Sequence, residues 1–540
     1  MATIGEEPAT AGTVKPRVSA YAWYALFVLV LVYIVNFVDR QIISILVGDI
    51  QRDLKVSPAQ VGFLYGTAFA VFYALFGIPL GRLADSWYRG RLMAMGLALW
   101  SSMTALSGFA TSFTMLAAAR IGVGIGEASA SPAAYSMISD SFPKERRATA
   151  LSIYSSGLYI GGALSLPIGG FVVASWNKAY PVAAEAPLGL AGWQAAFLAV
   201  GLPGLLLALW VLTLREPQRG ASDGMPQPVV RPNAWREFGK ELFAILPPFT
   251  LISTARMPGA FLPNIAMLAA VVLVAWGLAM LTGTPAQWVA YGLGVYAIFS
   301  WVQSLKRRDP PTYKLIWGSP AFMLLAVAFG SISFVTYATS FWLPYYVEEH
   351  FYGGAAMPAR YIAGLTAKAE VGLIIGTTAA ISAAIGVILG GYLSDLWRQR
   401  DPRGRIFINM LSVLLPIPIV AFLLTTNDLA AFYWVNPVAH LLASAWVGAA
   451  VATLQDLVLP RMRATAGATY VLGTTMVGLA LGPYFAGQVI GMTNHNIALG
   501  IAALYFMPIL TLTGLTLGAR HIASLESSKV ERARAAGEPI

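Results

Sequence analysis

The stretch Gly-Arg-Leu-Ala-Asp-Ser-Trp at residues 81–87 occurs again, in altered form, as Gly-Tyr-Leu-Ser-Asp-Leu-Trp at residues 391–397. Each copy follows a long apolar run, and basic residues follow each copy. A second pair is repeated at a similar distance: Arg-Ala-Thr-Ala at 147–150 with Tyr154, and Arg-Ala-Thr-Ala at 463–466 with Tyr470. Two motifs repeated in corresponding places predict a duplicated chain with two halves of one architecture.

Apolar runs recur along the whole chain, which has 540 residues, 57% of them hydrophobic and only 11% charged. A helix of about 20 apolar residues crosses the hydrocarbon core of a membrane and satisfies its backbone hydrogen bonds internally. We therefore expect an all-α membrane protein. The predicted spans are 22–47, 58–80, 92–111, 113–138, 147–175 and 191–214; an inserted pair, 263–282 and 286–304; and 319–347, 369–393, 406–425, 430–459, 464–490 and 496–518.

The basic residues indicate the orientation of these spans. Of the 35 Lys and Arg residues, 33 lie outside the predicted helices, and with the N-terminus in the cytoplasm 28 of these fall on the cytoplasmic side, where such residues accumulate. The exceptions are Arg52, Lys55, Lys178, Arg360 and Lys368. Both termini are thus predicted to be cytoplasmic. The absence of cysteines and of Asn-x-Ser/Thr acceptors favours a bacterial inner (plasma) membrane.

The spans and loops divide the chain into two six-helix bundles separated by an insertion. Trp235, Phe238, Leu242 and Phe243 alternate with charged residues in the linker, which suits an amphipathic helix on the membrane surface; an ordinary solvated linker is the alternative. The predicted segments are a cytoplasmic tail (1–21), the first bundle (22–214), a linker with the amphipathic helix (215–262), an inserted two-helix hairpin (263–304), a second linker (305–318), the second bundle (319–518) and a cytoplasmic tail (519–540).

Charged residues near the middle of the predicted spans lie in the first half: Asp39, Arg40, Arg120 and Glu127. Such residues are expensive in a membrane and usually work in pairs. Asp39 could pair with Arg120, or Arg40 with Glu127, and Asn36 shares a helix face with Arg40. The second half offers only neutral polar groups in the equivalent spans, followed by a histidine: Ser333, Thr336, Tyr337, Thr339, Ser340 and His440. We expect His440 to be a packing residue.

These charges suggest a proton switch. A buried carboxylate that leaves its arginine partner takes up a proton more readily. We assign proton coupling first to Asp39 and second to Glu127. Arg40 and Arg120, with Asn36, would exchange ion-pair partners or hold an anionic substrate head group. A fixed structural ion-pair cluster is the alternative.

Several of these residues resemble motifs of the major facilitator superfamily. Residues 81–91 are similar to the signature loop of the family between helices two and three, and Arg120 stands where many members have a basic residue. The fifth span is similar to the family's glycine-proline helix through Gly157, Gly161, Gly162, Pro167, Gly169 and Gly170. The resemblance implies a major facilitator fold, to which this chain adds two extra transmembrane helices. It also implies a cytoplasmic gate of loop charges: Gly81, Arg82, Asp85, Asp140 and Arg147, mirrored by Asp395 and Arg463. Anchoring of the loops at the interface is the alternative role.

Within the superfamily, Asn36 to Arg40 and the run from Arg120 to Asp140 resemble spinster-like transporters. This implies proton-coupled movement of lysophospholipid-like or sphingosine-like amphiphiles or related organic anions. A sugar-acid or drug exporter of the same superfamily is the alternative, and a non-transporting lipid sensor or scaffold is a third possibility.

The chain lacks the motifs of several other protein classes. It has no phosphate-binding loop ending in Lys-Ser/Thr, no His-Glu-x-x-His and only four histidines. The glycines at 122, 124 and 126 lie within a spanning helix and serve close packing. We expect no enzymatic activity, no cofactor, no metal and no nucleic-acid partner. The expected partners are the small amphipathic or anionic substrate, protons and the lipid bilayer, with the protein acting as a monomer.

Overall fold

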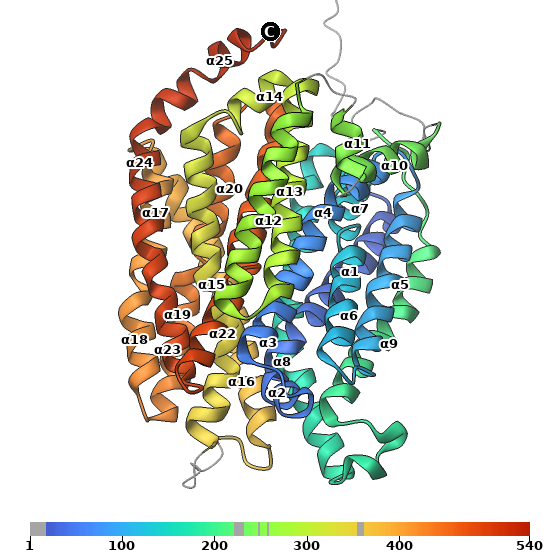
Figure 1. The fold of residues 1–540 in the computed structure, drawn as a ribbon, viewed down its shortest axis with the longest axis vertical. Coiled ribbons are helices and arrows are strands. Elements are labelled where there is room, and N and C mark those ends of the chain that lie inside the picture. Colours follow the sequence, from blue (N-terminus) through green and yellow to red (C-terminus); the bar gives the residue numbers. More distant parts are fainter. Residues whose placement is uncertain are drawn as a thin grey trace, which may run out of the picture.

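The computed structural model describes residues 18–220, 230, 232–246, 249–255, 259–353 and 361–539, so most of the predicted N-terminal tail lies outside the described residues. The described chain is built of helices (Figure 1). The first half contains α1 (Ala20–Gln41), η1 (Ile42–Ile45), α2 (Val47–Leu54), α3 (Pro58–Tyr65), α4 (Thr67–Ala84), α5 (Arg89–Ser107), α6 (Phe113–Glu127), α7 (Ala130–Ser141), α8 (Lys144–Ala179), η2 (Ala183–Glu185), η3 (Pro187–Gly189) and α9 (Gly192–Leu212).

The middle of the chain forms α10 (Ala234–Ile245), α11 (Phe249–Ala255), α12 (Phe261–Thr282), α13 (Pro285–Arg308) and α14 (Pro310–Leu315). The second half contains α15 (Pro320–Tyr352), α16 (Ala367–Arg398), α17 (Gly404–Leu414), α18 (Pro416–Thr425), α19 (Leu429–Ser444), α20 (Trp446–Asp456), η5 (Pro460–Met462), α21 (Arg463–Gly473), the π-helical η6 (Thr474–Leu479), α22 (Gly482–Met492), α23 (Ile497–Ala502), η7 (Ala503–Phe506), α24 (Met507–Ser527) and α25 (Lys529–Ala535).

Every predicted span falls on helix, and eleven helices of the described residues are long and apolar enough to cross a membrane. The predicted spans that are not among these eleven helices are 92–111, 113–138 and 286–304. They fall on α5, on α6 with α7, and on α13. The inserted segment forms a hairpin of α12 and α13, and of these two helices only α12 reaches the hydropathy of a span. The amphipathic linker segment is helical as α10.

Several predicted spans are bent or broken. Gly66 separates α3 from α4 with backbone angles of φ −88° and ψ −91°, outside the helical range. Pro416 begins α18 directly after α17, because a proline has no N–H to continue the helical hydrogen bonds. The pieces of a broken span still follow one another along its predicted length, as α3 and α4 do and as α17 and α18 do.

The two halves lie side by side with the hairpin between them (Figure 1). We call the end that carries α10, α11, α14 and α25 the inner end, and the opposite end, which carries α2, the outer end. Near the outer end the halves pack along two seams, α3 against α22 and α8 against α16. A Cβ atom on Gly372 of α16 would lie 2.5 Å from the carbonyl oxygen of Leu166 of α8, so the two backbones are in contact. Toward the inner end, Cβ atoms built on Gly162 of α8 and Gly391 of α16 would meet no atom within 4 Å. The halves therefore meet at the outer end and separate toward the inner end.

Candidate functional site

Arg40 of α1 and Glu127 of α6 form a buried ion pair inside the first half. The Nη2 and Nε atoms of Arg40 lie 2.6 and 3.3 Å from Oε2 of Glu127. Asn36, one turn earlier on α1, accepts a long hydrogen bond of 3.5 Å from the same guanidinium group. Of the two pairings that the sequence allowed, this is the one present in the structure.

Asp39 and Arg120 are completely buried beside this pair. Nη1 of Arg120 donates a 3.3 Å hydrogen bond to the backbone oxygen of Asp39, not to its carboxylate. Among the described residues, neither carboxylate oxygen of Asp39 has a hydrogen-bond partner of normal geometry, although Trp100 and Thr104 of α5 are polar neighbours. Asp39 is thus a buried acid without a bonded counter-charge in this arrangement.

The packing of α6 explains how these groups become buried. A Cβ atom on Gly124 of α6 would lie 2.5 Å from the carbonyl oxygen of Phe69 of α4, so only glycine permits this approach. The guanidinium of Arg40 lies 4.4 Å from the ring centre of Phe69 and 4.8 Å from that of Phe37. Aromatic faces attract cations, and they partly replace water around Arg40 here.

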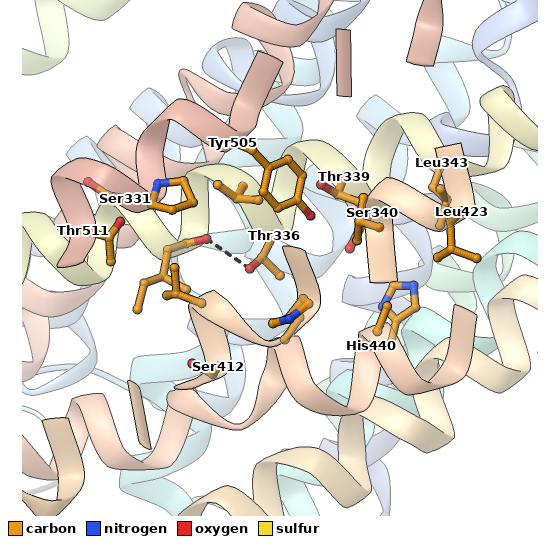
Figure 2. Close-up of a pocket in the computed structure, with 18 of the residues that line it drawn as sticks. Ser331, Thr336, Thr339, Ser340, Leu343, Ser412, Leu423, His440, Tyr505 and Thr511 are labelled. Atoms are coloured by element: carbon orange, nitrogen blue, oxygen red, sulfur yellow. Dashed lines mark hydrogen bonds between the residues drawn. The ribbon is translucent and has the colours of Figure 1, made fainter. Parts of the chain in front are cut away.

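The second half contains a cavity (Figure 2). The cavity lies among α15, α17, α18, α19, η7 and the start of α24. The lining is largely apolar, with neutral polar groups supplied by Ser331, Thr336, Thr339, Ser340, Ser412, Asn436, His440, Tyr505 and Thr511. Thr336, Thr339, Ser340 and His440 had been singled out from the sequence, and the other polar groups had not.

Two fully buried polar atoms of the cavity lining have no hydrogen bond of normal geometry among the described residues: Oδ1 of Asn436 and Oγ1 of Thr339, the latter close to the hydroxyl of Tyr505. The hydroxyl of Thr336, in contrast, donates to the backbone oxygen of Ile332 at 3.0 Å, shown as the dashed line in Figure 2. Buried polar groups normally have partners, so Asn436 and Thr339 are the natural contacts for a polar group of a ligand.

At the inner end of the first half, the charges gather around Arg89, which the sequence did not single out. The buried guanidinium forms ion pairs with Asp140 of α7 and with Glu216 after α9, the latter at 2.6 Å. Asp140 also accepts a 3.0 Å hydrogen bond from the backbone nitrogen of Gly220. The predicted gate residue Asp140 is therefore bound to Arg89 and to the linker.

The other predicted gate residues of the first half lie around this cluster. Gly81 and Arg82 belong to α4, Asp85 follows it, and Arg147 lies in the first turn of α8. Arg82 and Asp85 are exposed and line a hollow at the inner end together with Asp140.

At the inner end of the second half, Asp395 of α16 forms a 2.8 Å ion pair with Arg405 of α17. Arg405 and Arg398 both pair with Asp456, Arg398 at 2.6 Å. Arg463 is exposed at the start of α21. These pairs remain within one half, so the gating roles of these residues stay predictions.

At the outer end, one ion-pair cluster joins the two halves. Nζ of Lys368 of α16 lies 2.7 Å from Asp49 of α2 and 3.2 Å from Glu348 of α15, and it donates to the backbone oxygen of Ile45 at 3.1 Å. The only signal in the sequence was a lysine at the predicted outer end of a span.

Comparison with known proteins shows the family of this chain. The pattern of the Major Facilitator Superfamily matches residues 29–483. An MFS-type efflux pump of Mycolicibacterium smegmatis is 26% identical over 498 residues, which cover 91% of each chain. Protein spinster homolog 1 of Mus musculus is 25% identical over 472 residues, 86% of this chain and 72% of that protein.

Among solved structures, a bacterial homolog of the human lysosomal transporter spinster, in an inward-facing and occupied conformation, has the same fold. The TM-score is 0.66 at 24% sequence identity, over 95% of this chain and 98% of the other. Spinster homologues are thus among the sequence and structural relatives. The chain belongs to the Major Facilitator Superfamily and is a membrane transporter, not an enzyme.

Proposed function

We propose that this secondary transporter moves amphipathic lipids, such as lysophospholipid-like or sphingosine-like molecules, or related organic anions, and that proton movement drives it. The observation that carries the proposal is the buried Arg40–Glu127 pair with the unbonded acid Asp39 beside it. Ionisable groups at such positions mark ion and substrate pathways in membrane proteins.

The proton step follows from the different surroundings of the two acids. Glu127 forms an ion pair with Arg40 in this arrangement, and a neighbouring opposite charge favours the anionic form of an acid. Asp39 is fully buried beside Trp100 and Thr104 and has no bonded cation, and burial without a bonded cation favours the neutral form of an acid. We assign the transported proton to Asp39 in this arrangement. When the halves rearrange, Arg120 would move from the backbone of Asp39 to its carboxylate and release the proton.

The substrate class follows from the contrast between the halves. Arg40 and Arg120 offer positive charge to an anionic head group, and Asn36 is available as a hydrogen-bonding partner. The cavity of the second half offers an apolar lining with neutral hydrogen-bonding groups such as Asn436 and Thr339. A molecule with one charged end and one apolar chain suits both surroundings at once, which favours an amphiphile over a compact polar metabolite.

The transport cycle would be alternating access by a monomer, and the separation of the halves toward the inner end fits its inward-open stage. We place the inner end in the cytoplasm and the protein in a bacterial inner membrane, because the basic residues accumulate at that end. The hairpin α12–α13 would add two membrane spans to the twelve of the bundles. Both termini would then be cytoplasmic.

The test is transport by the purified protein in liposomes with an imposed pH gradient. A labelled lysophospholipid or sphingosine-like amphiphile is followed for the wild type and for Asp39→Asn. Glu185→Gln, the same kind of change at an exposed acid near the outer end, is the matched control. We expect gradient-driven uptake that Asp39→Asn loses and Glu185→Gln keeps.

Other results would favour other functions. Uptake of a sugar acid or a drug, with no uptake of amphiphiles, would support the alternative substrates of the same superfamily. Binding of lipid without any transport, by protein that is shown to be folded, would support a sensor or scaffold. Equal uptake by the wild type and Asp39→Asn at every pH would overturn the assigned proton site.

A further inference from the structure

The hairpin α12–α13 covers one of the two seams between the halves. Of its two helices, α13 packs against α4 of the first half. A Cβ atom on Gly294 of α13 would lie 3.0 Å from Val71 of α4 and 2.6 Å from Met476 of η6. These residues belong to a small apolar core shared by α4, α10, α13, α21 and η6. The hairpin therefore covers the continuation of the α3–α22 seam toward the inner end, where α4 of the first half faces α21 and η6 of the second, and we call this part the α4–α21 seam.

At the outer end, hydrogen bonds attach the tip of the hairpin to the second half. The hydroxyls of Thr284 and of Tyr484 of α22 are 2.5 Å apart. Gln488 of α22 donates to the backbone oxygen of Thr282 at 3.2 Å and to the hydroxyl of Tyr484 at 2.7 Å. Directional bonds of this kind fix the tip on α22.

At the inner end, an ion pair attaches the hairpin to the second half as well. Asp309, directly after α13, pairs with Arg461 at 2.8 Å, and Arg461 also pairs with Glu538 after α25. The guanidinium of Arg461 lowers the pKa of Asp309 to about 2, so this pair stays charged at physiological pH. The hairpin is thus attached to the second half at both of its ends.

The contact with the first half is of a different kind. α13 meets α4 through apolar side chains, among them Val71, Ala74 and Leu75. The ion pair described on that side joins Arg308 to Glu241 of the linker helix α10, and the arginine is half exposed, which makes such a pair weak. Apolar contacts are non-directional, so α4 can shift against α13 without breaking hydrogen bonds.

The opposite seam, between α8 and α16, has no such cover in the described part of the chain. Apart from each other, α8 packs against α1, α7 and α9 of its own half, and α16 packs against α15, α17, α19 and α20 of its own half. The close backbone contact near Leu166 and Gly372 ends before Gly162 of α8, whose Cβ position is open. The two seams are therefore unequal.

We propose that the hairpin α12–α13 is a cover carried by the second half, which keeps membrane lipids out of the α4–α21 seam and leaves the α8–α16 seam as the lateral opening. Entry of the transported amphiphile through that opening rests on the proposed function. The covering of the other seam does not rest on the proposed function, because the hairpin would exclude any lipid of the surrounding membrane.

Photo-crosslinking in phospholipid vesicles tests the cover without a transport assay. A benzophenone amino acid replaces one half-buried aromatic residue at each seam: Phe72 of α4, beside the hairpin, or Tyr159 in the inner half of α8. After illumination, mass spectrometry identifies the adducts. We expect adducts with peptides of α13 at position 72 and adducts with phospholipid at position 159. Because any bilayer lipid serves as the probe, the result holds even if no transported substrate is found.

The attachment of the hairpin to the second half is tested in the protein that carries the benzophenone amino acid at position 72. Tyr484→Phe with Gln488→Leu removes the bonds at the tip, and we expect lipid adducts at position 72 to rise severalfold. Val289→Ala, on the exposed face of α13, is the control and should change nothing. Lipid adducts at position 72 of the otherwise unchanged protein, as abundant as those at 159, would overturn the cover. An absence of lipid adducts at 159 would overturn the lateral opening, and no rise in the double variant would overturn the attachment.

Discussion

The two halves of the molecule repeat one helical fold, yet they bury different chemistry. The first half encloses Arg40, Glu127, Asp39 and Arg120 in helices that pack through glycines. The second half encloses a cavity with neutral polar groups. The repeated loop motifs at 81–87 and 391–397 show that the scaffold was kept, whereas the interiors diverged. Duplication thus allows one half to specialise in charge and the other in apolar volume.

Glu127→Gln should have the largest effect, because it leaves Arg40 buried without its carboxylate. Removal of one partner from a buried ion pair destabilises a protein by about 3–5 kcal/mol. We expect a lower unfolding temperature in thermal denaturation and transport reduced to background in liposomes. Glu185→Gln, the same change at an exposed acid near the outer end, should leave both properties close to those of the wild type.

A double variant separates folding from function at the same site. Arg40→Met with Glu127→Gln removes both charges, and replacement of a complete buried pair is often neutral for stability. We expect the unfolding temperature to recover while transport stays at background. Recovery of transport in this variant would show that the pair is structural only, and the contrast between the halves would then have no functional meaning.

Asp39→Asn should change the response to pH more than the rate. The amide keeps the size of the side chain but cannot release a proton, so uptake should no longer follow the imposed pH gradient. Counterflow exchange of labelled for unlabelled substrate, which needs no net proton movement, should persist. The measurement is uptake and exchange at several external pH values. Loss of both activities in a folded variant would contradict a specific coupling role.

Ala439→Phe should reduce transport in a way that depends on the substrate. Ala439 of α19 lines the cavity, and overfilling a packed interior costs about 1–3 kcal/mol. We expect KM to rise by about tenfold for a long-chain amphiphile, which corresponds to about 1.4 kcal/mol, and less for a short-chain one. Val438→Phe, the exposed neighbour on the same helix, is the control. Equal changes in KM for the long-chain and short-chain substrates would show that the apolar chain does not bind in this cavity.

The sequence predicted the helices and their duplication because each follows from local patterns, namely apolar runs and repeated motifs. It also identified the buried charges, but the choice between two pairings depends on how α1 and α6 are rotated against each other. That rotation is set by contacts such as Gly124 against Phe69, which join distant segments. The partners of Arg89 were missed for the same reason, since Glu216 is far away along the chain. Asn436 and Tyr505 were missed because helix breaks change which face points into the cavity.

The smallest predicted effect lies at the outer end, where the two halves meet. Lys368→Gln leaves Asp49 and Glu348 as neighbouring acids without their shared cation, whereas Asp49→Asn leaves the Lys368–Glu348 pair within the second half. Lys368→Gln should therefore weaken the contact between the two halves at the outer end more than Asp49→Asn does. The chain has no native cysteine, so Ser44→Cys, buried in η1 near this cluster, provides a single label site. We expect a membrane-impermeant maleimide to label it about fivefold faster with Lys368→Gln, corresponding to about 1 kcal/mol, and less than that with Asp49→Asn. If Asp49→Asn exposed the site more, the closure would depend on a contact of the first half alone and not on a pairing between unlike halves.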